Sequence, residues 1–116
     1  MYTANQIQVI LDEASVAAEK ASNDLYNQYG TDGKGCCGFA WVNIYMLDGQ
    51  KIKGNTKVGR TLKKLGIKQD WTRAFSVWNP SNYGGQNVDI KEVGARAYAE
   101  VLNKYGFAAH AGSRLD

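Results

Sequence analysis

The chain of 116 residues has few residues that form disulfides, kink helices or bind metals. It contains one proline, two cysteines and one histidine, His110. The cysteines, Cys36 and Cys37, are adjacent, and a disulfide between neighbours is strained. We therefore expect reduced thiols with packing roles, as in a reducing compartment. Because a zinc site needs more ligands than these residues supply, we expect no metal.

Long hydrophobic runs are also missing. The longest, from Gly38 to Met46, is interrupted by Asn43 and is far shorter than the roughly 20 residues that cross a bilayer. The first residues lack the basic start and apolar core of a signal peptide. We therefore expect a cytoplasmic protein without a membrane partner. The length and the 44% share of hydrophobic residues predict one domain over residues 1–116.

Acidic residues are missing from one stretch of the chain. The net charge is only +3, yet no Asp or Glu lies between Asp48 and Asp70. Half of the 14 basic residues do lie there, namely Lys51, Lys53, Lys57, Arg60, Lys63, Lys64 and Lys68. Such a run forms either a solvated surface or an electropositive face for phosphate, nucleotide or nucleic acid. The sequence leaves both interpretations open.

Catalytic motifs are absent as well. The chain has no Gly-x-Ser-x-Gly elbow, Walker loop, dinucleotide fingerprint or helical metal motif. A Cys–His pair would require the fold to bring His110 to one of the two cysteines. We therefore expect a binding protein without a cofactor and assign no catalytic residue. A small hydrolase or transferase that acts on nucleotides is the enzymatic alternative.

The periodicity of apolar residues predicts three helices. Thr3 and Gln6 form a capping-box pattern before an apolar stripe that should end at Gly30. A second helix is expected over residues 56–65. A third is expected to begin at Asp89, whose side chain would cap it.

Three segments read as strands, at about residues 39–47, 72–79 and 107–114. The first has apolar residues on both faces, which is typical of a central strand buried on both sides. Asp48-Gly49 can turn the chain into an extra hairpin strand near Lys51. The α-β-α-β-α-β order predicts an α+β domain in which helices cover a small mixed sheet.

Groups that could bind a nucleotide gather in two regions, which are otherwise an ordinary capped helix with surface lysines and a turn with self-satisfied side chains. Lys57 and Arg60 lie near the start of the second helix, where free backbone N–H groups favour an anion. The loop over residues 79–86 offers amide, hydroxyl and aromatic groups that can stack a base and bind its edge. Arg96 and Arg114 need an anionic partner, either an internal carboxylate or a ligand phosphate.

We expect these groups to converge on one cavity, with Asn79, Arg96 and Arg114 as the test of convergence. Asn43, inside the predicted central strand, would be either a structural clamp or the floor of this polar pocket. The predicted ligand-binding residues are Asn43, Lys57, Arg60, Trp78, Asn79, Ser81, Tyr83, Gln86, Arg96 and Arg114.

Four motifs in a fixed order resemble a known family. They read CGFAWVNI at residues 37–44, WNPS at 78–81, KEVGARAYAEVL at 91–102 and SRLD at 113–116. Together they resemble a small family of proteins encoded by tailed bacteriophages. The resemblance implies a phage-encoded accessory protein in the host cytoplasm, and it implies no catalytic mechanism.

Phage accessory proteins of this size commonly bind and block host factors, and some sequester nucleotide immune signals. The resemblance therefore favours a protein that binds a small anionic, nucleotide-type ligand and counters host defence. One alternative is an inhibitor that uses the basic helix against an acidic host protein. Another is a nucleic-acid binder without sequence preference. A homo-oligomer with its ligand at a subunit interface is compatible with each of these.

Overall fold

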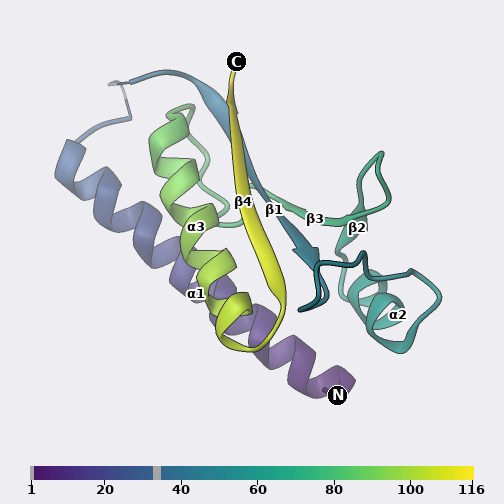
Figure 1. Cartoon of the computed structure of the whole chain (residues 1–116). Helices are drawn as coiled ribbons and strands as arrows, with labels where there is room; N and C mark the ends of the chain where they lie inside the picture. The colour runs from purple at the N-terminus through teal and green to yellow at the C-terminus, as the bar shows by residue number, and fades with distance from the viewer. Residues whose placement is uncertain (1, 33–34) are drawn as a thin grey trace.

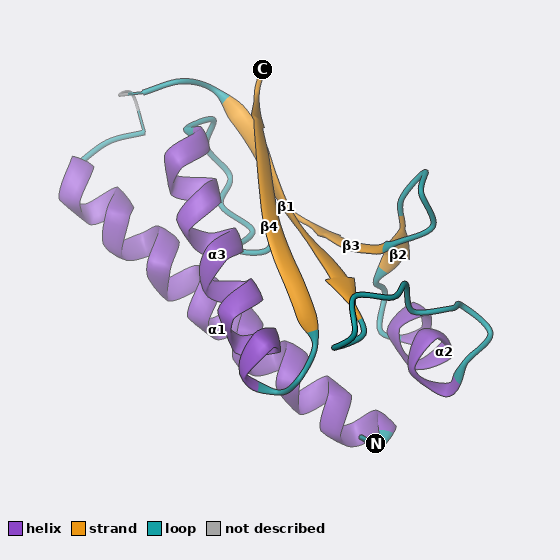
Figure 2. Cartoon of the chain, viewed as in Figure 1, coloured by secondary structure: helices purple, strands orange, loops and turns teal. Residues whose placement is uncertain are grey.

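The computed structural model describes residues 2–32 and 35–116. Its helices and strands follow in the predicted order, which confirms the α+β class (Figure 2). The elements are α1 (Ala4–Tyr29), β1 (Gly38–Tyr45), α2 (Lys57–Lys64), β2 (Lys68–Gln69), β3 (Phe75–Trp78), α3 (Val88–Lys104) and β4 (Ala108–Leu115). None of the described helices has the length and apolar character of a membrane-spanning segment.

Helix α1 begins and ends where its sequence predicts. The hydroxyl of Thr3 accepts the backbone N–H of Gln6 at 3.2 Å, and the Gln6 side chain accepts the N–H of Thr3 at 2.8 Å. The helix ends at Gly30, whose φ of 72° is the left-handed conformation that glycine adopts without strain. Capping signals in the sequence therefore set both ends of this helix.

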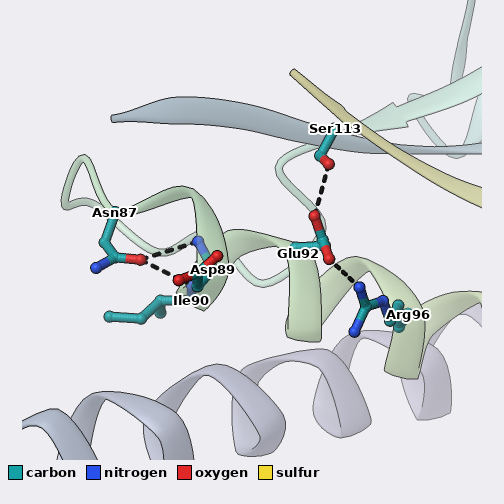
Figure 3. A network of polar contacts seen from close by, with 6 residues as sticks. All are labelled: Asn87, Asp89, Ile90, Glu92, Arg96 and Ser113. Carbon is teal, nitrogen blue, oxygen red and sulfur yellow. Dashed lines mark hydrogen bonds and ion pairs between the residues drawn. The ribbon is translucent and has the colours of Figure 1, made fainter. Parts of the chain in front are cut away.

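The start of α3 differs from the prediction. Asn87, and not Asp89, is the capping residue, because its Oδ1 accepts the N–H groups of Asp89 at 2.9 Å and Ile90 at 3.2 Å (Figure 3). Asp89 lies in the first turn instead, where the helix dipole favours a carboxylate.

Strand β1 lies inside the sheet, as predicted, in the order β2-β3-β1-β4. All strand pairs among the described residues are antiparallel, where a mixed sheet was expected. The reason is that α3 carries the chain from β3 across β1 to β4, so these two parallel strands do not pair with each other (Figure 1). The extra hairpin strand near Lys51 is reduced to a single bridge with Tyr45.

Helices α1 and α3 lie side by side on one side of the sheet (Figure 1). The alternate β1 residues Ala40, Val42 and Ile44 face them and are buried. Gly94 of α3 allows close packing, since a Cβ at this position would lie 2.5 Å from the hydroxyl of Ser22 in α1. The resulting core occupies only one side of the sheet.

No described element covers the opposite side. The sequence predicts that β1 is buried on both faces, and this prediction is wrong. The alternate β1 residues on that side are only partly buried. Buried residues of both long helices belong to the one core. Helix α2 lies near β2 (Figure 1). We name the uncovered side the open face. It consists of Phe39, Trp41, Asn43, Tyr45, Ser76, Trp78, His110, Gly112 and Arg114.

Candidate functional site

The open face bears an aromatic cluster that joins two strands. Trp41 of β1 and Trp78 of β3 are directly opposite, with ring centroids 5.9 Å apart and an interplanar angle of 2°. The ring of Phe39 lies 5.4 Å from that of Trp78. The side of the cluster away from the core is accessible, because Trp78 is 58% exposed. The cluster therefore presents flat aromatic surface to solvent.

Gly112 of β4 makes room for this arrangement. It is the register partner of Trp41, and a Cβ at Gly112 would lie 2.7 Å from the Trp41 indole. A side chain at this position would therefore displace the ring. The absence of one allows the indole to lie against the β4 backbone.

Two cationic groups lie close to one ring of this cluster, that of Phe39. The guanidinium carbon of Arg114 lies 5.6 Å from the Phe39 ring centroid, within the range of a cation–π contact. Buried Lys91 places its Nζ 5.4 Å from the same ring and donates to the Gly38 carbonyl at 2.9 Å. Arg114 forms no ion pair with a described carboxylate, so its charge is available to a ligand.

The loop between β2 and β3, residues 70–74, projects from the sheet on the side away from α1 and α3 (Figure 1). We name it the hairpin loop. Its Trp71 is 93% exposed. Together with Trp41, Asn43, Trp78 and Arg114, Trp71 lines a hollow of about 430 Å³, the aromatic hollow.

Asp70 orders the hairpin loop. Its Oδ1 accepts the backbone N–H of Thr72 at 2.8 Å, the Thr72 hydroxyl at 2.6 Å and the N–H of Ala74 at 3.2 Å. Burial opposes ionisation of this carboxyl, but the hydrogen bonds outweigh it and hold the pKa of Asp70 below its usual value. Trp71 is thus exposed on a loop with internal hydrogen bonds.

Asn43 contributes an unmet polar group to the aromatic hollow. Its Oδ1 is buried and accepts no hydrogen bond from the described residues. Buried amide oxygens are nearly always hydrogen-bonded. A ligand N–H group would satisfy it once the Asn43 side chain turns toward the aromatic hollow.

The structure brings three of the ten predicted residues to this hollow, namely Asn43, Trp78 and Arg114. The loop after β3 uses several of its polar groups internally, although the buried Oδ1 of Asn79 and hydroxyl of Ser81 have no hydrogen-bond partner among the described residues. Asn79 donates to the Tyr83 carbonyl at 2.9 Å, the Tyr83 hydroxyl donates to Asp32, and the backbone N–H of Gln86 donates to Asp32 at 3.0 Å. Ser81, in the same loop, is buried.

Arg96 lies on the other side of β4 from Arg114. It forms an ion pair with Glu92 on the exposed surface of α3, and Glu92 also accepts the Ser113 hydroxyl at 2.6 Å (Figure 3). The expected convergence of Asn79, Arg96 and Arg114 is therefore not found. The reason is that α3 covers one side of the sheet and Arg114 points to the other.

The start of α2 is satisfied by its own residues. The Thr56 hydroxyl accepts the N–H of Gly59 at 3.2 Å, and Arg60 donates to the Asn55 carbonyl at 2.6 Å. Lys57 is exposed beside this cap. These two cations do not line the aromatic hollow.

The sequence interpretation missed Trp71 and Asp32. A tryptophan in a turn between charged residues, outside any apolar pattern, could have indicated an exposed ring. Asp32 had no local signal, because the pKa of its carboxyl is lowered by the distant Tyr83 hydroxyl and by the backbone N–H groups of Gln86 and Asn87. Packing roles for Cys36 and Cys37 are also wrong, since both thiols are exposed.

The described residues place no group of three or more His, Cys, Asp or Glu side chains where they could hold a metal ion. Comparisons of the chain with protein-family models, curated proteins and solved structures found no match. The geometry of the open face is therefore the basis for a functional assignment.

Proposed function

We propose that the protein binds a nucleotide-type ligand by stacking its base on the open face. The supporting observation is the parallel pair of Trp41 and Trp78 on a sheet face that no described element covers. Stacking of a base on an aromatic side chain contributes about 1–3 kcal/mol and tolerates any base. Aromatic side chains on a four-stranded sheet are an established way to bind unpaired bases.

The polar groups of the aromatic hollow complement this chemistry. Once the Asn43 side chain turns toward the hollow, its unmet Oδ1 can accept an amino or imino N–H from a base edge. The guanidinium group of Arg114 can bind a phosphate or stack on a base. Net charge of +3 favours an anionic ligand further.

The resemblance to phage accessory proteins directs the choice of ligands to be tested. A protein of that class in the host cytoplasm would meet both nucleotide immune signals and nucleic acids. The panel therefore contains mononucleotides, cyclic dinucleotides and short single-stranded oligonucleotides. Sequestration of an immune signal is the proposed role if a cyclic dinucleotide binds most tightly.

The test is a titration of the protein with each ligand of this panel, in which binding is measured by tryptophan fluorescence and by calorimetry. We expect fluorescence quenching by at least one class of ligand, with affinity reduced about 5- to 150-fold in Trp78→Ala, as loss of one stacking contact implies. Tyr26→Ala is the aromatic control, because Tyr26 is 40% exposed on α1. If no ligand in the panel gives heat or quenching at micromolar protein, the proposal is refuted.

The nearly complete exposure of Trp71 supports a second candidate, a protein interface. Tryptophan, tyrosine and arginine are enriched where proteins bind one another. In this case a host protein, or a second copy of the chain, would cover the open face. Sedimentation of the protein alone, and competition between nucleotides and any protein partner, separates the two candidates.

A further inference from the structure

We infer that the ligand is a single-stranded nucleic acid whose phosphates lie in a second, basic hollow on the other side of the hairpin loop. This inference rests on the proposed function, because the bases of the strand would occupy the aromatic hollow. The open face alone does not distinguish a single nucleotide from a polynucleotide, and the basic hollow favours the polynucleotide.

The basic hollow has a volume of about 740 Å³ and lies between the segment after β1, α2 and the hairpin loop. Four cationic side chains line it, from Lys51, Lys53, Lys63 and Arg73. No described Asp or Glu is among its lining residues. Three of the seven cations of the acid-free stretch, together with Arg73, therefore form a concave, positively charged surface.

Three of these cations are available to a ligand. Lys53, Lys63 and Arg73 form no ion pair with a described carboxylate. Lys63 extends over Gly54, since a Cβ at that glycine would lie 2.6 Å from the Lys63 Nζ. A phosphate in the hollow would thus meet charges that have no internal counter-ion.

The hairpin loop joins the two hollows. Trp71 lines the aromatic hollow, and Arg73, two residues later, lines the basic hollow. Lys51 connects both sides, because its Nζ donates to the Thr72 carbonyl at 2.7 Å. A ligand that crosses this loop can therefore contact both surfaces.

The charges divide the ligand between the hollows. The carboxylate of Asp70 borders the aromatic hollow and offsets the charge of Arg114 there, which makes that hollow less favourable for a phosphate than the basic hollow. The basic hollow has the opposite character. Bases on the aromatic side and phosphates on the basic side give the arrangement that a polynucleotide backbone requires.

The open face favours a single strand over a duplex. Its rings can stack only on base faces that are not already stacked and paired. A duplex would present its phosphates to the basic hollow but no free base to Trp41 or Trp78. Binding should therefore depend on unpaired bases and on strand length.

The first experiment is a length series of thymidine oligonucleotides, from one to about sixteen nucleotides, measured by fluorescence anisotropy and tryptophan quenching. We expect affinity to rise with length until both hollows are filled. A matched duplex and polyglutamate serve as competitors and should displace the strand poorly. A uridine series repeats the measurement for RNA, and preference for either sugar supports the inference.

The second experiment removes charge from the basic hollow. The double variant Lys53→Gln, Lys63→Gln should weaken oligonucleotide binding and lower the salt slope by about 1.4, given about 0.7 for each phosphate contact of a single strand. The control Lys20→Gln, Lys64→Gln removes the same charge from residues that line neither hollow. It should leave the slope nearly unchanged.

The outcomes separate this inference from the proposed function. If mononucleotides bind as tightly as oligonucleotides, or if both double variants behave alike, the basic hollow does not hold the strand, whereas base stacking stands. Displacement by polyglutamate as effective as by oligonucleotide would overturn the inference in favour of an acidic protein. Absence of quenching with every ligand would refute the proposed function itself.

Discussion

The two faces of strand β1 have the same backbone and differ in what covers them. On the side of α1 and α3 the residues are small and aliphatic, such as Val42 and Ile44, and they are fully buried. On the open face the residues between them are Trp41, Asn43 and Tyr45, which are larger, partly polar and only partly buried. Residues of one strand therefore meet two different requirements, close packing on the covered side and partial exposure on the open face.

The covered face is explained by folding alone. Close packing against α1 and α3 requires small apolar side chains, and burial of such side chains stabilises the domain. The open face gains little from exposing Trp78 or Trp71 to water. Contact with a ligand explains its composition better. The following experiments compare the covered face and the open face.

The largest expected effect comes from exchanging a side chain on the covered face. Phe75→Ala should lower the free energy of unfolding by about 3–5 kcal/mol, because Phe75 is 0% exposed and its removal leaves a cavity. Trp78→Ala, three residues later on the open face, should cost only about 0.5–1.5 kcal/mol for lost aromatic contacts. Urea unfolding of the three proteins measures both values.

The same pair of variants should behave in the reverse order in ligand binding. Under conditions where both remain folded, Trp78→Ala should lose affinity and Phe75→Ala should keep it. Equal destabilisation by the two variants would mean that the open face belongs to the core, and it would break the comparison.

A pH-dependent effect is expected at the loop after β3. Hydrogen bonds from the Tyr83 hydroxyl and from the backbone of Gln86 and Asn87 lower the pKa of Asp32. The stabilisation by the carboxylate is therefore fully present above the unfolded pKa of about 3.9 and is lost as pH falls through the lower folded pKa. We expect Asp32→Asn to reduce thermal stability at neutral pH.

The difference in Tm between the native chain and Asp32→Asn should shrink as the pH falls below about 4. Ligand binding at neutral pH should change little, because Asp32 does not line the aromatic hollow. A difference in Tm that stays constant from neutral to acidic pH would show that the carboxylate charge is not involved.

The smallest effect is expected from Gly112→Ala. The added methyl group meets the Trp41 indole, so the ring must move while every aromatic side chain is retained. Affinity should fall by less than in Trp78→Ala, with a shift in tryptophan emission. Gly84→Ala is the control, since no atom lies within 4 Å of the added Cβ. Identical affinities of the two glycine variants would show that the position of Trp41 is unimportant.

Much of the fold was predictable from local signals. The capping box at Thr3 and the left-handed Gly30 bounded α1 because both act within a single turn of helix. The apolar run of β1 predicted an inner strand. It could not predict that only one side is covered, because this depends on which side of the sheet the helical connections cross.

The candidate site was less predictable for a related reason. An apolar residue such as Trp41 has the same pattern in the sequence whether a helix or a ligand covers it. The cations of the basic run were visible, but their meeting in a hollow depends on where the fold places the hairpin loop, α2 and the segment after β1. Arg96 illustrates the opposite case, because its partner Glu92 is one helical turn away and satisfies it locally.

The most direct test of base stacking compares two oligonucleotides of equal length, one of them abasic throughout. Both present the same phosphates to the basic hollow, and only one has bases for the open face. We expect the base-bearing strand to bind more tightly and to quench tryptophan fluorescence. The abasic strand should bind more weakly and should not quench. Equal affinity of the two strands, without quenching, would contradict the account.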